Sequence, residues 1–214
     1  MRLLLASLCL ILPVHAAASA DGAIAYGPSL SFIAYRNGEA IGRHDLVFAR
    51  DGSHLTVTTR IRLAVKFMGF TAYRYDHTAQ EVWQNQRLIS LSARTDDNGK
   101  LYDVRAERTP AGLAVRTNDR LETLSGSLLP SSHWNIAQVG QSALLNTQTG
   151  REARVRITLL GREQVRTAAG IVQASRYNYQ GDVEMDHWFD DLGRWVKTAF
   201  TASDGSRVDY VLAN

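Results

Sequence analysis

The stretch Arg60-Ile61-Arg62-Leu63-Ala64-Val65-Lys66-Phe67 decides the fold. Its larger apolar residues recur at every second position, which places Ile61, Leu63, Val65 and Phe67 on the core face of a β-strand. The same alternation recurs at residues 30–35 and 154–159. Dipeptides that favour tight hairpin turns punctuate the chain: Asn37-Gly38, Asp51-Gly52, Asn98-Gly99 and Asp204-Gly205. The sequence therefore predicts an all-β fold, a large curved antiparallel meander that forms a half-barrel or barrel.

One interval, residues 121–148, lacks this alternation. Its segment 128–135, Leu-Leu-Pro-Ser-Ser-His-Trp-Asn, indicates a loop that enters a short helix. Ser131 or Ser132 could cap that helix, with Trp134 turned inward. We expect this interval to form a lid across one mouth of the curved sheet.

The first twenty residues have the order of a secretory signal peptide. A positive start is followed by an apolar run at residues 3–12, the helix breaker Pro13 and small residues at 16–20. A membrane anchor is the alternative, but the apolar run is shorter than the ~20 residues that span a bilayer. We expect cleavage after Ala20, which leaves one β-rich domain, residues 21–214, in the periplasm or secreted.

Composition narrows the classes of function. Cys9 is the only cysteine and lies inside the predicted signal peptide, so the mature chain would have no disulfide, thiolate metal site or cysteine nucleophile. The formal net charge is +3, and the arginines occur singly along strand-like stretches instead of in one stripe. This distribution does not favour a nucleic-acid partner. No motif indicates a metal or a cofactor.

Two stretches of the sequence echo each other. In the first, Tyr73-Arg74-Tyr75 precedes Glu81-Val82-Trp83, and in the second, Tyr177-Asn178-Tyr179 precedes Asp186-His187-Trp188. The echo is either a chance product of hairpin composition or a duplicated meander whose halves enclose a shared interior. A period of two places the first set on the inner face, and a bulge near Gly181 would turn the second set to that same face.

The two acids and the tryptophans are the candidate site residues. Glu81 and Asp186 could share acid and base roles in one cavity, or each could accept hydrogen bonds that knit the sheet together. The tryptophans could stack on a ligand or serve as core anchors. We favour the structural role for the acids, and no residue is predicted to be catalytic. The candidate ligand-binding residues are Tyr75, Glu81, Trp83, Trp134, Asp186 and Trp188.

Several motifs together resemble an uncharacterised family of exported bacterial proteins, found mainly in proteobacteria and without an assigned activity. The motifs are Glu81-Val82-Trp83, Arg94-Thr95, Asn98-Gly99, the segment 129–135, Trp188-Phe189-Asp190, Gly193-Arg194 and Asp204-Gly205-Ser206. The closing motifs are also similar to the meanders of periplasmic lipoprotein-carrier-like half-barrels. That second resemblance implies an open curved sheet that could hold an acyl chain, and it transfers no catalytic residue.

These observations lead to one functional hypothesis and two alternatives. We expect an exported envelope protein that binds an apolar or amphipathic ligand, a lipid or a glycan, between the curved sheet and the lid. The first alternative is a hydrolase that uses Glu81 and Asp186. The second is a structural partner of an envelope complex, which would show an exposed apolar patch or an unpaired sheet edge.

Overall fold

The computed structural model describes residues 26–213, and the predicted signal peptide lies outside them. These residues form fifteen strands and one short 3-10 helix. The elements are β1 (Ser29–Arg36), β2 (Glu39–Asp51), β3 (His54–Phe67), β4 (Phe70–Gln84), β5 (Arg87–Asp97), β6 (Lys100–Thr109), β7 (Gly112–Thr117), β8 (Arg120–Leu124), β9 (Leu129–Pro130), η2 (Ile136–Gly140), β10 (Ala143–Leu145), β11 (Glu152–Thr167), β12 (Gly170–Gly181), β13 (Met185–Asp190), β14 (Trp195–Thr201) and β15 (Arg207–Leu212).

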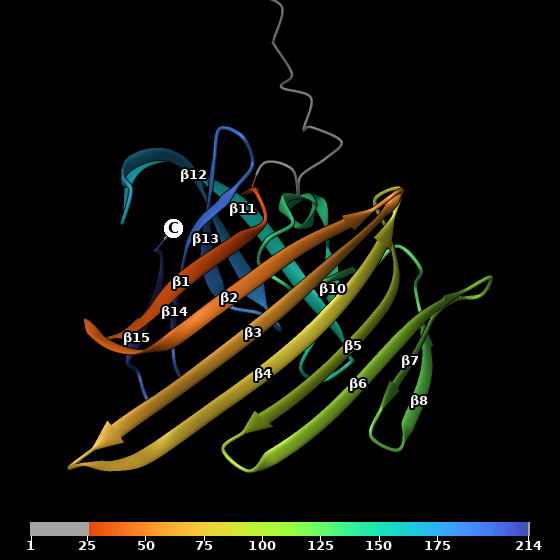
Figure 1. Ribbon diagram of the computed structural model, residues 1–214, viewed down its shortest axis with the longest axis horizontal. Coiled ribbons are helices and arrows are strands. Elements are labelled where there is room, and N and C mark those ends of the chain that lie inside the picture. The colour runs from red at the N-terminus through yellow and green to blue at the C-terminus, as the bar shows by residue number, and fades with distance from the viewer. Residues whose placement is uncertain (1–25, 214) are drawn as a thin grey trace, which may run out of the picture.

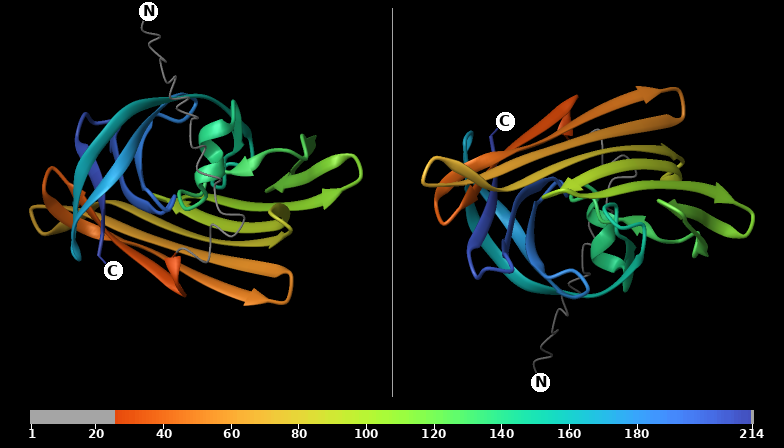
Figure 2. Two further views of the ribbon diagram at one scale, coloured as in Figure 1. Left: turned by 90° about the horizontal axis from the view of Figure 1, so that it is seen from above. Right: turned by 90° about the horizontal axis from the view of Figure 1, so that it is seen from below.

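All fifteen strands belong to one sheet. Its order is β8-β7-β6-β5-β4-β3-β2-β1-β15-β14-β13-β12-β11-β10-β9, so strands from the two ends of the described chain pair at its centre. Every pair is antiparallel except β9 with β10. Strands β11–β15 curl round, β3–β8 extend as a flatter wing, and β8 and β9 remain edges (Figures 1 and 2). The sheet is not closed, which confirms the predicted all-β, half-barrel-like fold.

Burial follows the alternation that the sequence shows. Along β3, Val57 and Ile61 are buried and Arg60 and Arg62 are exposed. The inner faces of both halves meet in one main core, where the rings of Phe32 and Trp195 stack with centroids 3.7 Å apart. Each strand therefore contributes alternate residues to a core shared by both halves of the sheet.

The predicted lid is present, but its helix begins at a different residue. The Asn135 side chain caps η2 by accepting a hydrogen bond from the Ala137 amide, so the prediction of Ser131 or Ser132 as the cap is wrong. Trp134 is turned inward and is 4 % exposed, as expected. The η2 segment lies between the curled strands and the flatter part of the sheet (Figure 2).

The two echoed stretches do not occupy equivalent strands. Residues 73–83 lie within the single strand β4. Residues 177–188 instead cross a turn, because Tyr177 and Tyr179 lie on β12 and Trp188 lies on β13. The shared spacing therefore reflects similar hairpin composition. The two stretches are not copies of one duplicated meander.

Candidate functional site

Glu81 lies at the centre of a buried polar contact. Its Oε2 atom accepts hydrogen bonds from the indole nitrogens of Trp83, at 2.8 Å, and Trp134, at 3.3 Å. The side chain is fully buried, no cation of residues 26–213 forms an ion pair with it, and burial raises the pKa of the carboxyl group. Burial favours the neutral carboxyl because it penalises the charge. Glu81 thus joins the lid to β4 through hydrogen bonds, which matches the structural role.

The aromatic residues around Glu81 fill the space of the expected ligand cavity. The rings of Trp83 and Trp134 pack edge to face with centroids 5.5 Å apart, and Phe48 packs against Trp134. Tyr75 lies further along β4 and is half-buried, with its hydroxyl donating to Gln148 Oε1 at 3.2 Å. Trp83 and Trp134 belong to the main core, and Phe48 packs against it.

Asp186 and Trp188 lie on the opposite face of the sheet. The β12–β13 register is unbroken and pairs Asn178 with Asp186 and Arg176 with Trp188, so both residues face away from Tyr177 and the main core. Trp188 is nevertheless 2 % exposed, because it packs in a second hydrophobic cluster on that other face. The prediction that they share the inner face with Glu81 is therefore wrong. The structure brings together Glu81, Trp83 and Trp134 and separates them from Asp186 and Trp188.

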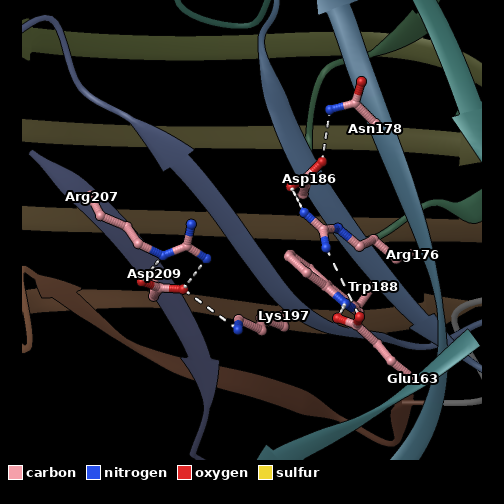
Figure 3. Close-up of polar contacts among 8 residues, drawn as sticks. All are labelled: Glu163, Arg176, Asn178, Asp186, Trp188, Lys197, Arg207 and Asp209. Atoms are coloured by element: carbon pink, nitrogen blue, oxygen red, sulfur yellow. Dashed lines mark hydrogen bonds and ion pairs between the residues drawn. The ribbon is translucent and has the colours of Figure 1, made fainter. Parts of the chain in front are cut away.

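Asp186 and Trp188 take part in a polar network on this face of the sheet (Figure 3). Asp186 accepts hydrogen bonds from Arg176 at 2.6 Å and from Asn178 at 2.8 Å. Trp188 lies between the cations of Arg176 and Lys197, 5.1 and 4.8 Å from its ring centroid. Because the two acids lie on opposite faces and have separate partners, the paired-carboxylate hydrolase is not supported.

A cluster of buried and half-buried histidines is the interior feature that the sequence analysis missed. His44, His133 and His187 come from β2, the lid and β13, and His133 Nδ1 lies 2.8 Å from His187 Nε2. The ring of His44 is 5.3 Å from that of His133, and neither of its nitrogens has a partner within the described residues. The position of His44 two residues before Leu46, on the inner face of β2, was the available signal.

These histidines are held neutral by burial. Burial lowers the pKa of His133 to about 4, and it lowers the pKa of His77, on β4, to about 4 as well. Within residues 26–213, no group of three or more His, Cys, Asp or Glu residues is arranged to hold a metal ion. The cluster joins the lid to both halves of the sheet through neutral imidazoles.

The exposed tip of the β3–β4 hairpin is the other feature that the sequence analysis missed. Phe67, Met68 and Phe70 are 68, 82 and 78 % exposed. The alternation predicted Phe67 in the core, and this is wrong because β3 continues past the edge of the core. We call residues 67–70 the apolar tip.

The apolar tip stands at the end of a two-stranded ribbon. The last pair between β2 and β3 is Gly42 with Leu63, and the first between β4 and β5 is Tyr75 with Asp97. Residues 64–73 therefore pair only within the β3–β4 hairpin, and Arg74 also accepts a hydrogen bond from the Asn98 amide. The ribbon forms the lower left extremity of the molecule in Figure 1.

Comparison with known proteins identifies the family. A domain of unknown function, DUF6134, matches residues 32–213. The chain belongs to the DUF6134 family. The DUF6134 match includes all strands from β2 to β15, so it covers both the curled and the flatter parts of the sheet. No curated protein matches the DUF6134 chain.

A solved structure shows the same fold as this DUF6134 chain. It is a β-barrel-like protein of the domain of unknown function DUF1849 from Brucella abortus, with a TM-score of 0.62 and 10 % sequence identity. The similarity covers 87 % of this chain and 95 % of that chain. At this identity the likeness establishes barrel-like architecture alone. Residues 26–213 contain no helix long and apolar enough to cross a bilayer.

Proposed function

We propose that this chain is exported to the bacterial envelope and binds a membrane lipid surface there through the apolar tip, without catalysing a reaction. The observation that carries the proposal is the exposure of Phe67, Met68 and Phe70 at the end of a projecting ribbon. Contiguous exposed apolar side chains mark surfaces that contact lipid or another protein. The predicted signal peptide supports the location.

Lipid suits this tip better than a glycan does. Phe67, Met68 and Phe70 have no side-chain donor or strong acceptor for sugar hydroxyls. Transfer of three such side chains into an apolar phase is worth roughly 5 kcal/mol in total. This proposal keeps the lipid that the sequence analysis expected as the ligand. It places the lipid site at the end of the ribbon instead of in the packed interior.

Site-specific labelling tests the proposal with an internal control. Cys9 is the only cysteine, so a Cys9→Ser background allows one environment-sensitive fluorophore to be attached at a chosen position. Met68→Cys places the label on the apolar tip, and Ser53→Cys places it on the β2–β3 turn, at the opposite end of β3. With phospholipid vesicles, we expect a blue shift and brighter emission at position 68 and no change at position 53.

Two results would overturn the proposal. One is an unchanged label at position 68 together with protein that stays in the supernatant when vesicles are sedimented. The other is concentration-dependent dimerisation in sedimentation velocity that the triple variant Phe67→Asp, Met68→Asn, Phe70→Lys removes. That second result would assign the tip to a second copy of the chain.

A further inference from the structure

An open groove lies at the base of the ribbon that carries the apolar tip. Its volume is about 640 Å³. It is lined by Ile41, Gly42, Arg60, Arg62, Leu63, Ala64, Thr71, Arg74 and Asp76. Three arginines therefore face one carboxylate, and Lys66 adds a further cation between this groove and the tip. We call it the arginine groove.

The arginines of this groove are only partly neutralised by their neighbours, since Asp45 of β2 is directly opposite Arg60. Asp76 is shared between Arg74, at 2.5 Å, and Arg62, at 4.0 Å. Arg62 is also directly opposite Arg43 of β2, and like charges at opposed strand positions repel each other. An anion seated in the groove would relieve this repulsion, and a guanidinium group matches the geometry of phosphate.

The spacing between groove and tip fits the depth of a lipid headgroup layer. Ala64, which is paired with Arg74, lies three residues before Phe67, or roughly 10 Å along the strand. Apolar side chains of peripheral proteins enter the headgroup and acyl boundary by roughly 5–10 Å. With the ribbon upright and the tip inserted to this depth, the edge of the groove reaches the level of the phosphates.

We propose that the arginine groove binds the phosphate headgroup of an anionic phospholipid while the apolar tip enters the same leaflet. This inference rests on the proposed function and specifies its ligand class. Arg60 and Arg62 supply the charge on β3, and Arg74 supplies it on β4. The site therefore has two parts, an apolar end and a cationic base, on one hairpin.

A matched pair of variants tests the headgroup site. Arg60→Gln with Arg62→Gln removes two charges from the arginine groove. Arg154→Gln with Arg156→Gln removes two charges from an equivalent Arg-x-Arg pair that lines another open groove, on β11. Binding of the full chain is measured by co-sedimentation with vesicles of phosphatidylcholine alone and with added phosphatidylglycerol.

We expect the unsubstituted protein to prefer the phosphatidylglycerol vesicles. The Arg60/Arg62 variant should lose at least about tenfold in affinity for them and little for phosphatidylcholine, whereas the Arg154/Arg156 variant should change less than about twofold. Equal losses in both variants, or no preference for the anionic lipid, would overturn the headgroup site. If the position 68 label still responds to phosphatidylcholine, the proposed function survives that failure.

Discussion

The β3–β4 and β5–β6 hairpins end in the same turn with opposite chemistry. Met68 and Gly69 have φ angles of 50° and 85°, and Asn98 and Gly99 have φ angles of 51° and 92°. Phe67 pairs with Phe70 across the first turn, whereas Asp97 pairs with Lys100 across the second. The two tips therefore share a backbone and differ in what they present to their surroundings.

The turn geometry alone explains the residues of the β5–β6 tip, but it does not explain Met68 in the β3–β4 tip. Asparagine tolerates the left-handed conformation because its short side chain bonds to nearby backbone, and Asn37 and Asn85 occupy the same conformation in two other hairpins. Methionine gains nothing from this conformation, and its side chain is 82 % exposed. Local strain at Met68 is of the kind that is common at functional positions, and the proposed contact with lipid would account for it.

The largest expected effect is a loss of folding stability at low pH, which affects the whole sheet that carries both tips. Burial holds His77 and His133 neutral with pKa values of about 4, against about 6.5 in an unfolded chain. The unfolded chain therefore binds more protons between these values, so stability is full above pH 6.5 and falls as the pH drops toward 4. We expect urea titrations to show roughly 3–5 kcal/mol less stability at pH 4.5 than at pH 7.

A pair of histidine substitutions on one hairpin tests this pH dependence. His77→Gln should reduce the pH dependence by about one proton, and His54→Gln, at an exposed position of β3, should leave it unchanged. Equal pH dependence in both variants would show that His77 does not supply the proton. The two tips are best compared near pH 7, where the fold is most stable.

Exchange of the tip chemistry is the next largest effect. Phe67→Asp, Met68→Asn and Phe70→Lys copy the β5–β6 tip onto the β3–β4 ribbon without a change in turn geometry. Loss of three inserted apolar side chains should weaken vesicle binding at least about 100-fold, which co-sedimentation measures. Circular dichroism should show an unchanged sheet. Retained binding would assign the lipid contact to another surface.

The sequence predicted the sheet well and the site poorly, for identifiable reasons. Alternation defined β3 because every second residue from Val57 to Ile61 meets the core. It failed at Phe67 because periodicity does not show where a strand extends beyond the strands beside it. That point depends on where β2 pairs with β3 and where β5 pairs with β4. It failed at Asp186 because the face of each residue of β13 depends on its register with β12, which pairs Asp186 with Asn178 and not with a tyrosine.

A single substitution separates stability from binding at the tip. Met68→Asn should raise the free energy of unfolding by up to about 1 kcal/mol, because asparagine adopts the left-handed conformation at lower cost. The same change should weaken vesicle binding about tenfold, because one inserted side chain is lost. Thermal unfolding and co-sedimentation on the same samples would show the opposed changes. A fall in both quantities would mean that Met68 packs within the protein.

The reciprocal substitution, at the β5–β6 turn, should have the smallest effect on stability and on vesicle binding. Asn98→Met should lower stability by about 0.5–1 kcal/mol, because methionine is strained at φ 51° and the contact from Asn98 Oδ1 to the Arg74 amide is lost. It should not create vesicle binding, because the charged side chains of Asp97 and Lys100 remain beside it. The β5–β6 turn also lies beside Arg74, at the base of the ribbon, since the Asn98 amide donates to the Arg74 carbonyl at 2.8 Å. New vesicle binding by this variant would show that exposed methionine alone is sufficient, and the projection of the β3–β4 ribbon would then lose its proposed role.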